Sequence, residues 1–317
     1  MPASVRTVLG DLAIGTLGRV DYHEHVFQVS PLLVGDELDD LVAGTAEVTL
    51  FRESGFESMV DATPIALGRR PAMVAALSAD VGVAVIATTG VHRDAHYASG
   101  HWLVDLAVPA LTSLLVRDIR DGMPVDDESA ARPLAQFDHR PVRAGVLKAG
   151  IDYWHISHRE REVLAAVSAA HSVTGAPVMI HLEHGSAAFE VLAVLAADEV
   201  AADAVCLAHI DRNPDPVLHA DLAEAGAYLG YDGFARSKNG PDSVLIDCLA
   251  KSIALGAGDR LLLGGDVARR TRYIAYGGMP GLAYLGDRVV PRLENELGRG
   301  PLDALLKINP ARWLARF

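Results

Sequence analysis

Five of the eight strand-like segments in this sequence end in a polar side chain of a kind found at metal centres. Each is a short apolar run that stops on His, Lys or Asp, which predicts a buried parallel strand delivering a polar group to one edge of a sheet. The five segments are residues 18–25, 144–148, 177–181, 204–209 and 261–266. Because they lie far apart in the chain, the repetition predicts a metal centre assembled from separate strands.

The other strand-like runs, at residues 58–63, 83–90 and 227–231, also alternate with Ala- and Leu-rich helical stretches. Such alternation permits a closed (β/α)8 barrel or an open doubly wound sheet. The barrel brings the ends of strands one, four, five, six and eight around one point by symmetry. No Gly-x-Gly-x-x-Gly follows the first strand, which removes the usual mark of a dinucleotide fold. We therefore predict one α/β domain, residues 1–317, folded as a (β/α)8 TIM barrel with its metal centre at the C-terminal face.

Three further segments carry local signals. Ser157 and Glu160 fit a capping box at the start of the helix that follows Lys148. The long connection from about residue 92 to 140 predicts a segment that covers the substrate, with a helical part from Leu103 onward. Residues 301–317 predict a closing helix with Trp313 and Leu314 on its buried side.

Composition excludes several classes of protein. The formal net charge of -13 argues against a nucleic-acid partner, because phosphate backbones require a basic surface, but it allows an anionic small ligand in a local cationic pocket. The N-terminus has no basic stretch followed by an apolar run, and no segment is apolar enough to span a membrane. Cys206 and Cys248 are too few for a disulfide framework. A cytoplasmic protein is expected.

The residues alone leave the chemistry of the centre partly open. His23 and His25 are two apart, so on an extended strand both imidazoles share a face and suit one metal, although one could be a hydrogen-bonded core histidine. Asp266 could likewise be a capping residue. Lys148 has no lone pair while protonated, but burial lowers a lysine pKa. The neutral amine could form a Schiff base, or could react with carbon dioxide to give a carbamate that bridges two cations.

Five motifs lie at the predicted strand ends: residues 21–25 (DYHEH), 143–149 (RAGVLKA), 180–185 (IHLEHG), 208–213 (AHIDRN) and 264–266 (GGD). On these motifs the sequence resembles the phosphotriesterase family of the amidohydrolase superfamily over nearly its whole length.

The resemblance implies a metal-dependent hydrolase with a binuclear centre. One ion would be held by His23, His25 and Asp266, and the other by His181 and His209. A carboxylated Lys148 and a hydroxide would bridge the two ions. Zinc is expected, with cobalt or manganese as alternatives. The hydroxide would attack the substrate while Asp266 takes its proton and passes it to the leaving oxygen.

Two segments point to an anionic substrate. Residues 231–243 and 266–273 follow the seventh and eighth strands, where barrels of this kind frequently bind phosphate. Both are similar to a bacterial branch of the family that hydrolyses phosphorylated sugar lactones. Lys238 and Arg269 match its phosphate-binding Lys and Arg. Its Tyr position is occupied by Arg272, with Tyr273 one residue later.

After the third strand, residues 91–97 also resemble the family, and Tyr97 is a candidate to orient the substrate carbonyl. Five other histidines are interpreted as surface residues or neighbours of the ligands: His92, His96, His155, His158 and His184.

The leading hypothesis is a lactonase for a phosphorylated or otherwise anionic sugar lactone. The alternative within the same centre is hydrolysis of neutral phosphotriesters, esters or acyl-homoserine lactones. A noncatalytic metal-stabilised scaffold and a Schiff-base lyase using Lys148 are rivals from other classes. The expected partner is the small-molecule substrate alone, with no nucleic acid and no membrane, and a homodimer is compatible with the sequence.

Overall fold

A computed structural model describes residues 3–236 and 240–316 of the chain. Eight parallel strands form one sheet in the order β12-β11-β10-β9-β8-β5-β4-β3, so β3 and β12, the first and last of these eight along the chain, are its two edges. The sheet curls into a nearly closed barrel, and the backbone N–H of Asp266 donates to His23 O at 2.8 Å where these edges meet. The prediction of a (β/α)8 barrel is confirmed. The strands are β3 (Val20–Glu24), β4 (Ser58–Asp61), β5 (Ala84–Val91), β8 (Val146–Ile151), β9 (Val178–Leu182), β10 (Val205–Ala208), β11 (Tyr228–Tyr231) and β12 (Leu261–Leu263).

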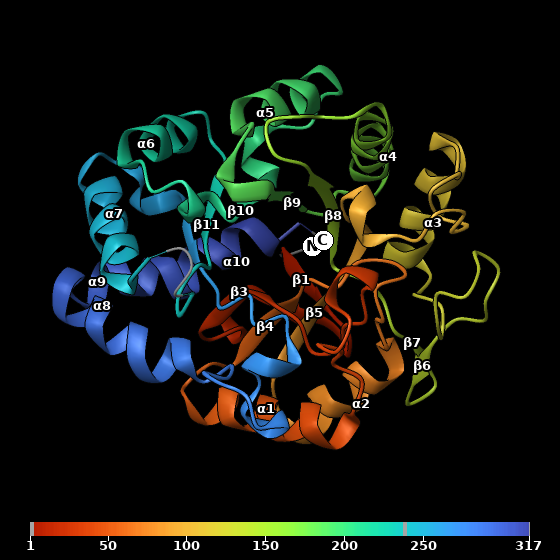
Figure 1. The fold of residues 1–317 in the computed structure, drawn as a ribbon, viewed down its shortest axis with the longest axis horizontal. Coiled ribbons are helices and arrows are strands. Elements are labelled where there is room, and N and C mark those ends of the chain that lie inside the picture. Colours follow the sequence, from red (N-terminus) through yellow and green to blue (C-terminus); the bar gives the residue numbers. More distant parts are fainter. Residues whose placement is uncertain (1–2, 237–239, 317) are drawn as a thin grey trace.

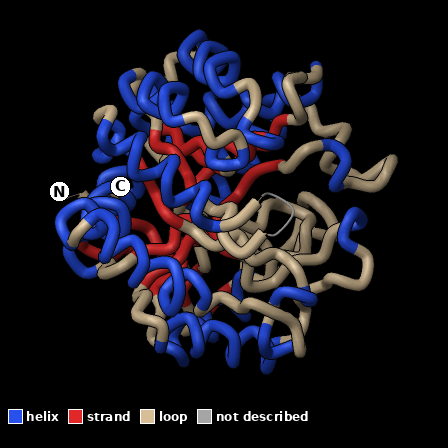
Figure 2. Tube along the Cα trace, turned by 60° about the vertical axis from the view of Figure 1, so that its left-hand side comes forward, coloured by secondary structure: helices blue, strands red, loops and turns tan. Residues whose placement is uncertain are grey.

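Helices form a ring around these strands (Figure 1). Most follow a strand and pack against the outside of the sheet, as right-handed strand–helix–strand units require. The helices are α1 (Leu41–Glu53), α2 (Pro71–Val81), α3 (Val108–Arg120), α4 (His158–Thr174), α5 (Ala188–Ala197), α6 (Pro216–Glu224), α7 (Asp242–Ala254), α8 (Val290–Leu297), α9 (Arg299–Asp303) and α10 (Asn309–Leu314). Loops gather at one end of the barrel, on the right of Figure 2.

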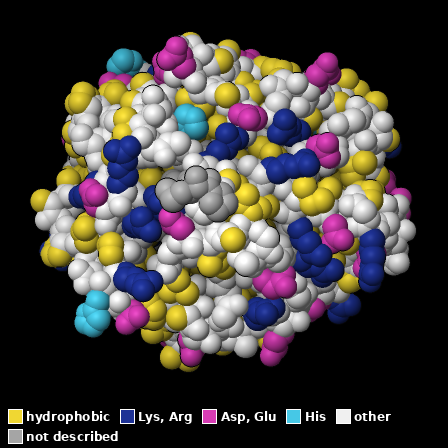
Figure 3. All heavy atoms as spheres, turned by 180° about the vertical axis from the view of Figure 1, so that it is seen from behind, with side chains coloured by type: hydrophobic (Ala, Val, Ile, Leu, Met, Phe, Trp, Pro, Cys, Tyr) yellow, Lys and Arg dark blue, Asp and Glu magenta, His cyan; other side chains and the backbone are white. Residues whose placement is uncertain are grey.

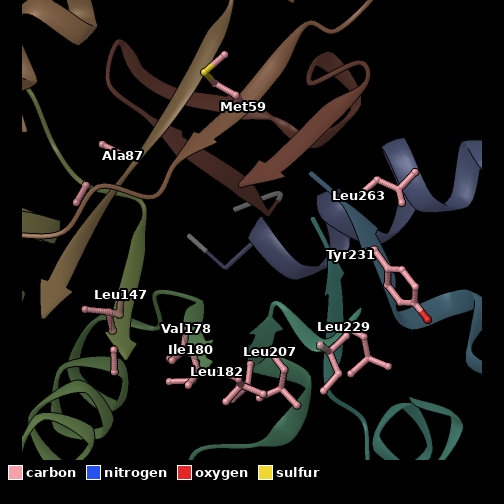
Figure 4. Packing of buried hydrophobic residues seen from close by; sticks show 14 of the residues in the cluster. Met59, Ala87, Leu147, Val178, Ile180, Leu182, Leu207, Leu229, Tyr231 and Leu263 are labelled. Carbon is pink, nitrogen blue, oxygen red and sulfur yellow. The ribbon is translucent and has the colours of Figure 1, made fainter. Parts of the chain in front are cut away.

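Alternation along the strands separates two apolar layers. In β9, Val178, Ile180 and Leu182 belong to the large cluster that packs between the sheet and the helices (Figure 4). Met179 faces the opposite side, in a second cluster that also contains Val146 and Trp313. Because alternate residues share a face, Lys148 and His181 continue the faces of Val146 and Met179 toward the carboxyl ends of their strands. The barrel interior is therefore polar at the carboxyl ends of the strands and apolar toward their amino ends.

Two of the three local signals are confirmed. Ser157 Oγ accepts from Glu160 N at 3.1 Å, and Glu160 Oε2 accepts from Ser157 N at 2.7 Å, which is the predicted capping box. Trp313 and Leu314 are buried, as expected for the closing helix, which is divided into α9, a π-helical turn at Ala304–Ile308 and α10.

The sequence analysis misplaced some element ends. The helical part of the long connection begins at Val108, with Pro109 in its first turn, and not at Leu103. Strand β12 ends at Leu263, three residues before Asp266, because Gly264 and Gly265 pass close to the side chains of Asp21 and Glu24. Two hairpins were not predicted: β1 (Ser4–Thr7) with β2 (Gly10–Ala13), and β6 (Gln136–Phe137) with β7 (Arg140–Pro141).

The surface agrees with the composition. On the face seen from behind, basic and acidic side chains are intermixed with apolar ones (Figure 3), unlike the single-sign surface that nucleic-acid binding favours. In the described ranges, no helix has both the length and the apolar character needed to cross a membrane.

The burial of Trp313 generates a stability prediction. Its side chain is fully buried, and its Nε1–H donates to Ala204 O at 3.3 Å, which ties α10 to the strand β10 side of the barrel. Trp313→Ala should lower the free energy of unfolding by about 3–5 kcal/mol, because a large cavity is left in a packed interior. Urea unfolding of the metal-free protein measures this. Trp154→Ala, at a side chain that is 61% exposed, is the matched control and should change stability by less than about 0.5 kcal/mol. Equal losses in both variants would contradict the packing account.

Candidate metal centre and active site

The six side chains predicted as metal ligands line one cavity of about 180 Å³ at the carboxyl ends of the barrel strands. They come from β3, β8 and β9 and from the residues that follow β3, β10 and β12. The sequence placed them on five separated segments, and the barrel brings them together. They are His23, His25, Lys148, His181, His209 and Asp266.

Three of these groups fit one metal ion. The Nε2 atom of His23 is buried and has no hydrogen-bond partner among the described residues. Asp266 Oδ1 lies 3.6 Å from His23 Nε2 and 3.6 Å from His25 Nε2. Ligand atoms held about 2.1 Å from a tetrahedral ion lie about 3.4 Å apart, so these spacings match a zinc-type site without rearrangement. His23, His25 and Asp266 therefore form a donor set that suits a divalent cation.

A buried aspartate that the sequence analysis gave no role orients two of the histidines. Asp232 Oδ1 accepts from His209 Nδ1 at 2.7 Å, and Asp232 Oδ2 lies 3.1 Å from His23 Nδ1. The hydroxyl of Tyr22 also donates to Oδ2. Burial opposes ionisation of Asp232, yet His209 and His23 hold the pKa of this carboxyl well below its usual range.

These contacts decide what Asp232 does. Its oxygens are occupied by ring N–H and hydroxyl donors at hydrogen-bond distances, so the group His23, His209 and Asp232 is a hydrogen-bond cluster and not a second place for an ion. With Nδ1 protonated in both rings, the Nε2 lone pairs of His23 and His209 are left for a metal.

His25 is oriented in the same way by Thr63. Its Nδ1 lies 2.8 Å from Thr63 Oγ1, and the Thr63 hydroxyl is itself within reach of Asp61 Oδ1 at 2.7 Å. Thr63 Oγ1 can therefore accept from the ring while donating to the carboxylate. Burial, and then Lys148, lower the pKa of His25, so its imidazole is neutral and keeps a lone pair on Nε2.

The second pair of histidines, His181 and His209, lies with one ring nitrogen of each directly facing the other. His181 Nδ1 and His209 Nε2 are 2.8 Å apart, while His181 Nε2 lies 3.0 Å from Glu183 Oε2. Burial, with His92 and His209, lowers the pKa of His181, and burial, with Arg212, lowers the pKa of His209 to about 3. If His181 Nε2 donates to Glu183 and His209 Nδ1 donates to Asp232, then His181 Nδ1 and His209 Nε2 both carry lone pairs that face each other. Only a cation or a shared proton between them relieves this repulsion. A small separation of the rings would accommodate an ion.

Lys148 lines the same cavity as the two histidine pairs and is almost fully buried. Its Nζ donates to Ala62 O at 2.5 Å. Burial lowers its pKa to about 8, although Asp266 and Asp61 act in the opposite direction. A neutral amine is therefore accessible near neutral pH, which is the form that reacts with electrophiles.

Asp266 combines a metal-facing oxygen with a cation-facing one. Oδ1 is directed to the two histidines of the first set, while Oδ2 accepts from Arg212 at 2.8 Å and from Arg236. Burial would raise the pKa of Asp266, but Arg236 and His23 outweigh it and hold the carboxyl ionised. Its backbone has φ of 44°, a strained conformation for a residue other than glycine, and such strain concentrates at functional sites.

The predicted substrate-binding residues divide into two groups. Arg269 and Arg272 line the cavity. Tyr273 is fully buried, and its hydroxyl donates to His25 O below the cavity, so Arg272 is the member of that pair at the site. Lys238 lies outside the described residues.

Tyr97 is not among the residues that line the cavity. Its hydroxyl accepts from His92 N at 2.8 Å and donates to Ile65 O at 3.2 Å. His92 and His96, which the sequence analysis treated as neighbours or surface residues, form the cavity wall instead, with ring centroids 3.9 Å apart. His155, His158 and His184 are exposed, as expected.

Sequence reasoning also missed three arginines of the cavity wall: Arg93, Arg212 and Arg236. Each follows a strand by a few residues, so a scan for basic residues just beyond strand ends would have found them. Asp232 follows β11 directly, and the same scan for carboxylates would have found it.

Comparison with known proteins identifies relatives over nearly the whole chain. The sequence profile of the phosphotriesterase family matches residues 3–314. A phospho-furanose lactonase of Mycoplasmopsis synoviae is 29% identical over 98% of this chain and 91% of the relative. An N-acetyltaurine hydrolase of Xenopus tropicalis is 25% identical over 99% of this chain and 98% of the relative.

Solved structures give the same result. A lactonase from Listeria monocytogenes superimposes with a TM-score of 0.90 and 29% identity, covering 99% of this chain and 100% of that chain. The phosphotriesterase homology protein of Escherichia coli, solved with phosphate in its active site, superimposes with a TM-score of 0.83 and 25% identity, covering 94% of this chain and 99% of that chain.

The role of Asp232 can be tested without touching a ligand. Asp232→Asn keeps the shape of the side chain but cannot accept from both rings and from Tyr22 at once. We expect metal affinity, measured by titration against a competing chelator, to fall about 10–100-fold. Asp247→Asn, at an exposed carboxylate on α7, is the matched control and should leave the affinity unchanged. If Asp232→Asn changed the affinity by less than about twofold, the orienting role would be wrong.

Proposed function

The chain belongs to the phosphotriesterase family, and on that premise we propose that it is a metal-dependent lactonase that opens a phosphorylated sugar lactone. The relatives named above include a phospho-furanose lactonase and a structurally similar lactonase, which supports the reaction class. The choice of an anionic substrate rests on this chain's own residues.

Arg272 is the observation that carries the choice. It is partly buried in the cavity wall, where, among the described residues, its guanidinium donates only to the backbone carbonyls Asp266 O at 3.2 Å and Phe234 O at 3.4 Å. No carboxylate within the described ranges forms an ion pair with it. Burial, and then the neighbouring Arg236, lower the pKa of Arg272, so its charged form is destabilised and an anion beside it would be favourable. A phosphate group of the substrate would supply one.

The charge balance of the cavity supports the same substrate. Its wall contains five guanidinium groups and two carboxylates on a protein whose net charge is -13. The five are Arg93, Arg212, Arg236, Arg269 and Arg272. Arg269 is held near Asp36, with 3.4 Å between Nη1 and Oδ2, and is half exposed, so it can turn toward a ligand. A neutral triester or acyl-homoserine lactone would leave Arg272 without an ion pair among the described residues, which disfavours the alternative.

The proposed cofactors are two divalent cations, with zinc first and cobalt or manganese as alternatives, and an N6-carboxylated Lys148. His23, His25 and Asp266 would hold one ion, and His181 and His209 the other. The carbamate would form when the neutral Nζ of Lys148 attacks the carbon of carbon dioxide and releases one proton. Burial of Lys148 supports this, because it favours the neutral amine. A cation pair of this kind supplies a nucleophile from water near neutral pH and polarises a carbonyl oxygen.

The remaining steps belong to side chains of the chain. Arg272 and Arg269, with Lys238 from the segment outside the described residues, would bind the phosphate and orient the lactone carbonyl toward the histidines. Asp266 would accept the proton of the attacking water and return it to the ring oxygen as the C–O bond breaks, giving a hydroxy acid. His96, whose pKa burial and then Arg93 lower to about 4, is neutral and can donate to a substrate hydroxyl. The cytoplasmic location, the homodimer and a role for Tyr97 stay predictions.

Substitution of Arg272 tests the anionic substrate. For a phosphorylated furanose lactone, Arg272→Met should lower kcat/KM about 10–100-fold, because a charge-assisted hydrogen bond contributes about 1.5–3 kcal/mol. For the same lactone without phosphate, kcat/KM should change little. Arg299→Met, at a side chain that is 87% exposed, is the matched control. An equal loss on both lactones, or faster turnover of neutral esters than of phosphorylated lactones by the native protein, would favour the alternative.

The pKa of Lys148 sets a pH dependence for assembly of the centre. Only the neutral amine attacks carbon dioxide, and with a pKa of about 8 the neutral fraction falls roughly tenfold per pH unit below that value. At fixed dissolved carbon dioxide, the rate at which metal-free protein takes up two ions should therefore rise with pH and level off above about 8. Lys148→Met should abolish both the dependence on carbon dioxide and the stoichiometry of two ions per chain. Uptake that is independent of carbon dioxide in the native protein would contradict the carbamate.

A further inference from the structure

A second hollow opens beside the metal centre, above the carboxyl ends of β8, β9 and β10. Its volume is about 730 Å³, much larger than the catalytic cavity. Arg93, Glu183 and Arg212 line both hollows, so the two lie next to each other. A single phosphorylated furanose ring needs no space of this size. We refer to this hollow as the side cleft.

Two aromatic residues stand exposed at the side cleft. Tyr153 is 57% and Trp154 61% exposed, and their rings meet edge to face with centroids 6.4 Å apart. The ring of His184 stands at 88° to that of Tyr153, 5.9 Å away. These side chains form a platform that is not buried by any described part of the chain.

The backbone holds this platform at a cost. Trp154 and His184 both have φ of 53°, a conformation that costs residues other than glycine of the order of 1–3 kcal/mol. The N–H of Trp154 is fixed by Ser186 Oγ at 3.0 Å, and that of Tyr153 by the Asp152 carboxylate at 2.7 Å. The strained backbone at Trp154 holds its ring in solvent, where the ring adds nothing to the packing of the core. This favours a role for the ring in binding.

The charge of the side cleft differs from that of the catalytic cavity. Arg93 is paired with Asp152 at 3.1 Å and with Glu183 at 3.0 Å, and Arg212 is paired with Asp266. Among the described residues that line the cleft, no cation is in excess, so a second anion is not favoured. Both arginines keep a buried Nε–H that no described atom accepts. The cleft therefore offers hydrogen-bond donors and acceptors beside an aromatic face, which suits a neutral, polyhydroxylated ring.

The two sites lie on different sides of the metal ligands. Arg269 and Arg272 follow β12, whereas the side cleft lies over β8, β9 and β10, which are consecutive neighbours in the sheet. A lactone held by its phosphate at Arg272 would direct its opposite, hydroxyl-bearing edge toward the cleft. From this geometry we propose that the side cleft is a subsite for a second sugar ring, and that the enzyme accepts glycosylated lactones. The inference rests on the proposed lactonase function.

Trp154 provides the test. We compare the disaccharide lactone lactobionolactone with the monosaccharide lactone gluconolactone on metal-loaded native protein and on Trp154→Ala. The ratio of their kcat/KM values, disaccharide to monosaccharide, should fall about 3–10-fold in Trp154→Ala, because one aromatic contact is lost. Phe189→Ala, at another exposed aromatic that does not line the cleft, is the matched control and should leave the ratio unchanged. An unchanged ratio in Trp154→Ala would overturn the subsite.

A binding measurement separates this inference from the proposed function. Lactobionic acid, which has no lactone to hydrolyse, should quench native tryptophan fluorescence with an affinity at least about 3–10-fold higher than gluconic acid, and Trp154→Ala should abolish the difference. Quenching without turnover of any lactone would retain the subsite and refute the lactonase. Turnover of phosphorylated lactones with equal affinity for both acids would retain the lactonase and refute the subsite.

Discussion

The candidate active site depends on one buried carboxylate. Asp232 accepts hydrogen bonds from the rings of His23 and His209, one from each proposed metal position, and so fixes which nitrogen of each imidazole is free. An ionised group with no exposure to solvent is costly unless its partners are in place, and here two rings and the Tyr22 hydroxyl supply them. Closure of the barrel makes this possible, because it brings β3, β10 and β11 close enough to share one acceptor.

Much of the fold could be predicted from the sequence because strands and helix starts depend on local sequence patterns. Apolar runs that end in His, Lys or Asp indicated parallel strands, and the capping box at Ser157 located a helix start. The positions of His181 and Asp266 in one cavity followed from barrel symmetry. Loop geometry did not follow, since it depends on contacts between distant segments. Tyr97 was a candidate to orient the substrate carbonyl, and nothing in the sequence indicated that its hydroxyl hydrogen-bonds to His92 N and Ile65 O.

The electrostatic parts of the site were least visible in the sequence. An Arg or Asp beyond a strand end resembles any solvated surface residue until its neighbours are known. Arg272 stands out because, among the described residues, its guanidinium bonds to carbonyl oxygens and forms no ion pair with a carboxylate. Arg93, in contrast, is neutralised by Asp152 and Glu183, which directly follow β8 and β9. This contrast divides the catalytic face into a cationic side and a neutral, aromatic side, and it underlies both the anionic substrate and the side cleft.

The most direct test of the account is an anomalous-scattering map from crystals of the metal-loaded protein. The account predicts two peaks about 3.5–4 Å apart, one within reach of His23, His25 and Asp266 and one within reach of His181 and His209, with extra density on Lys148 Nζ joining them. A single ion at another place, or two ions beside an unmodified Lys148, would contradict it.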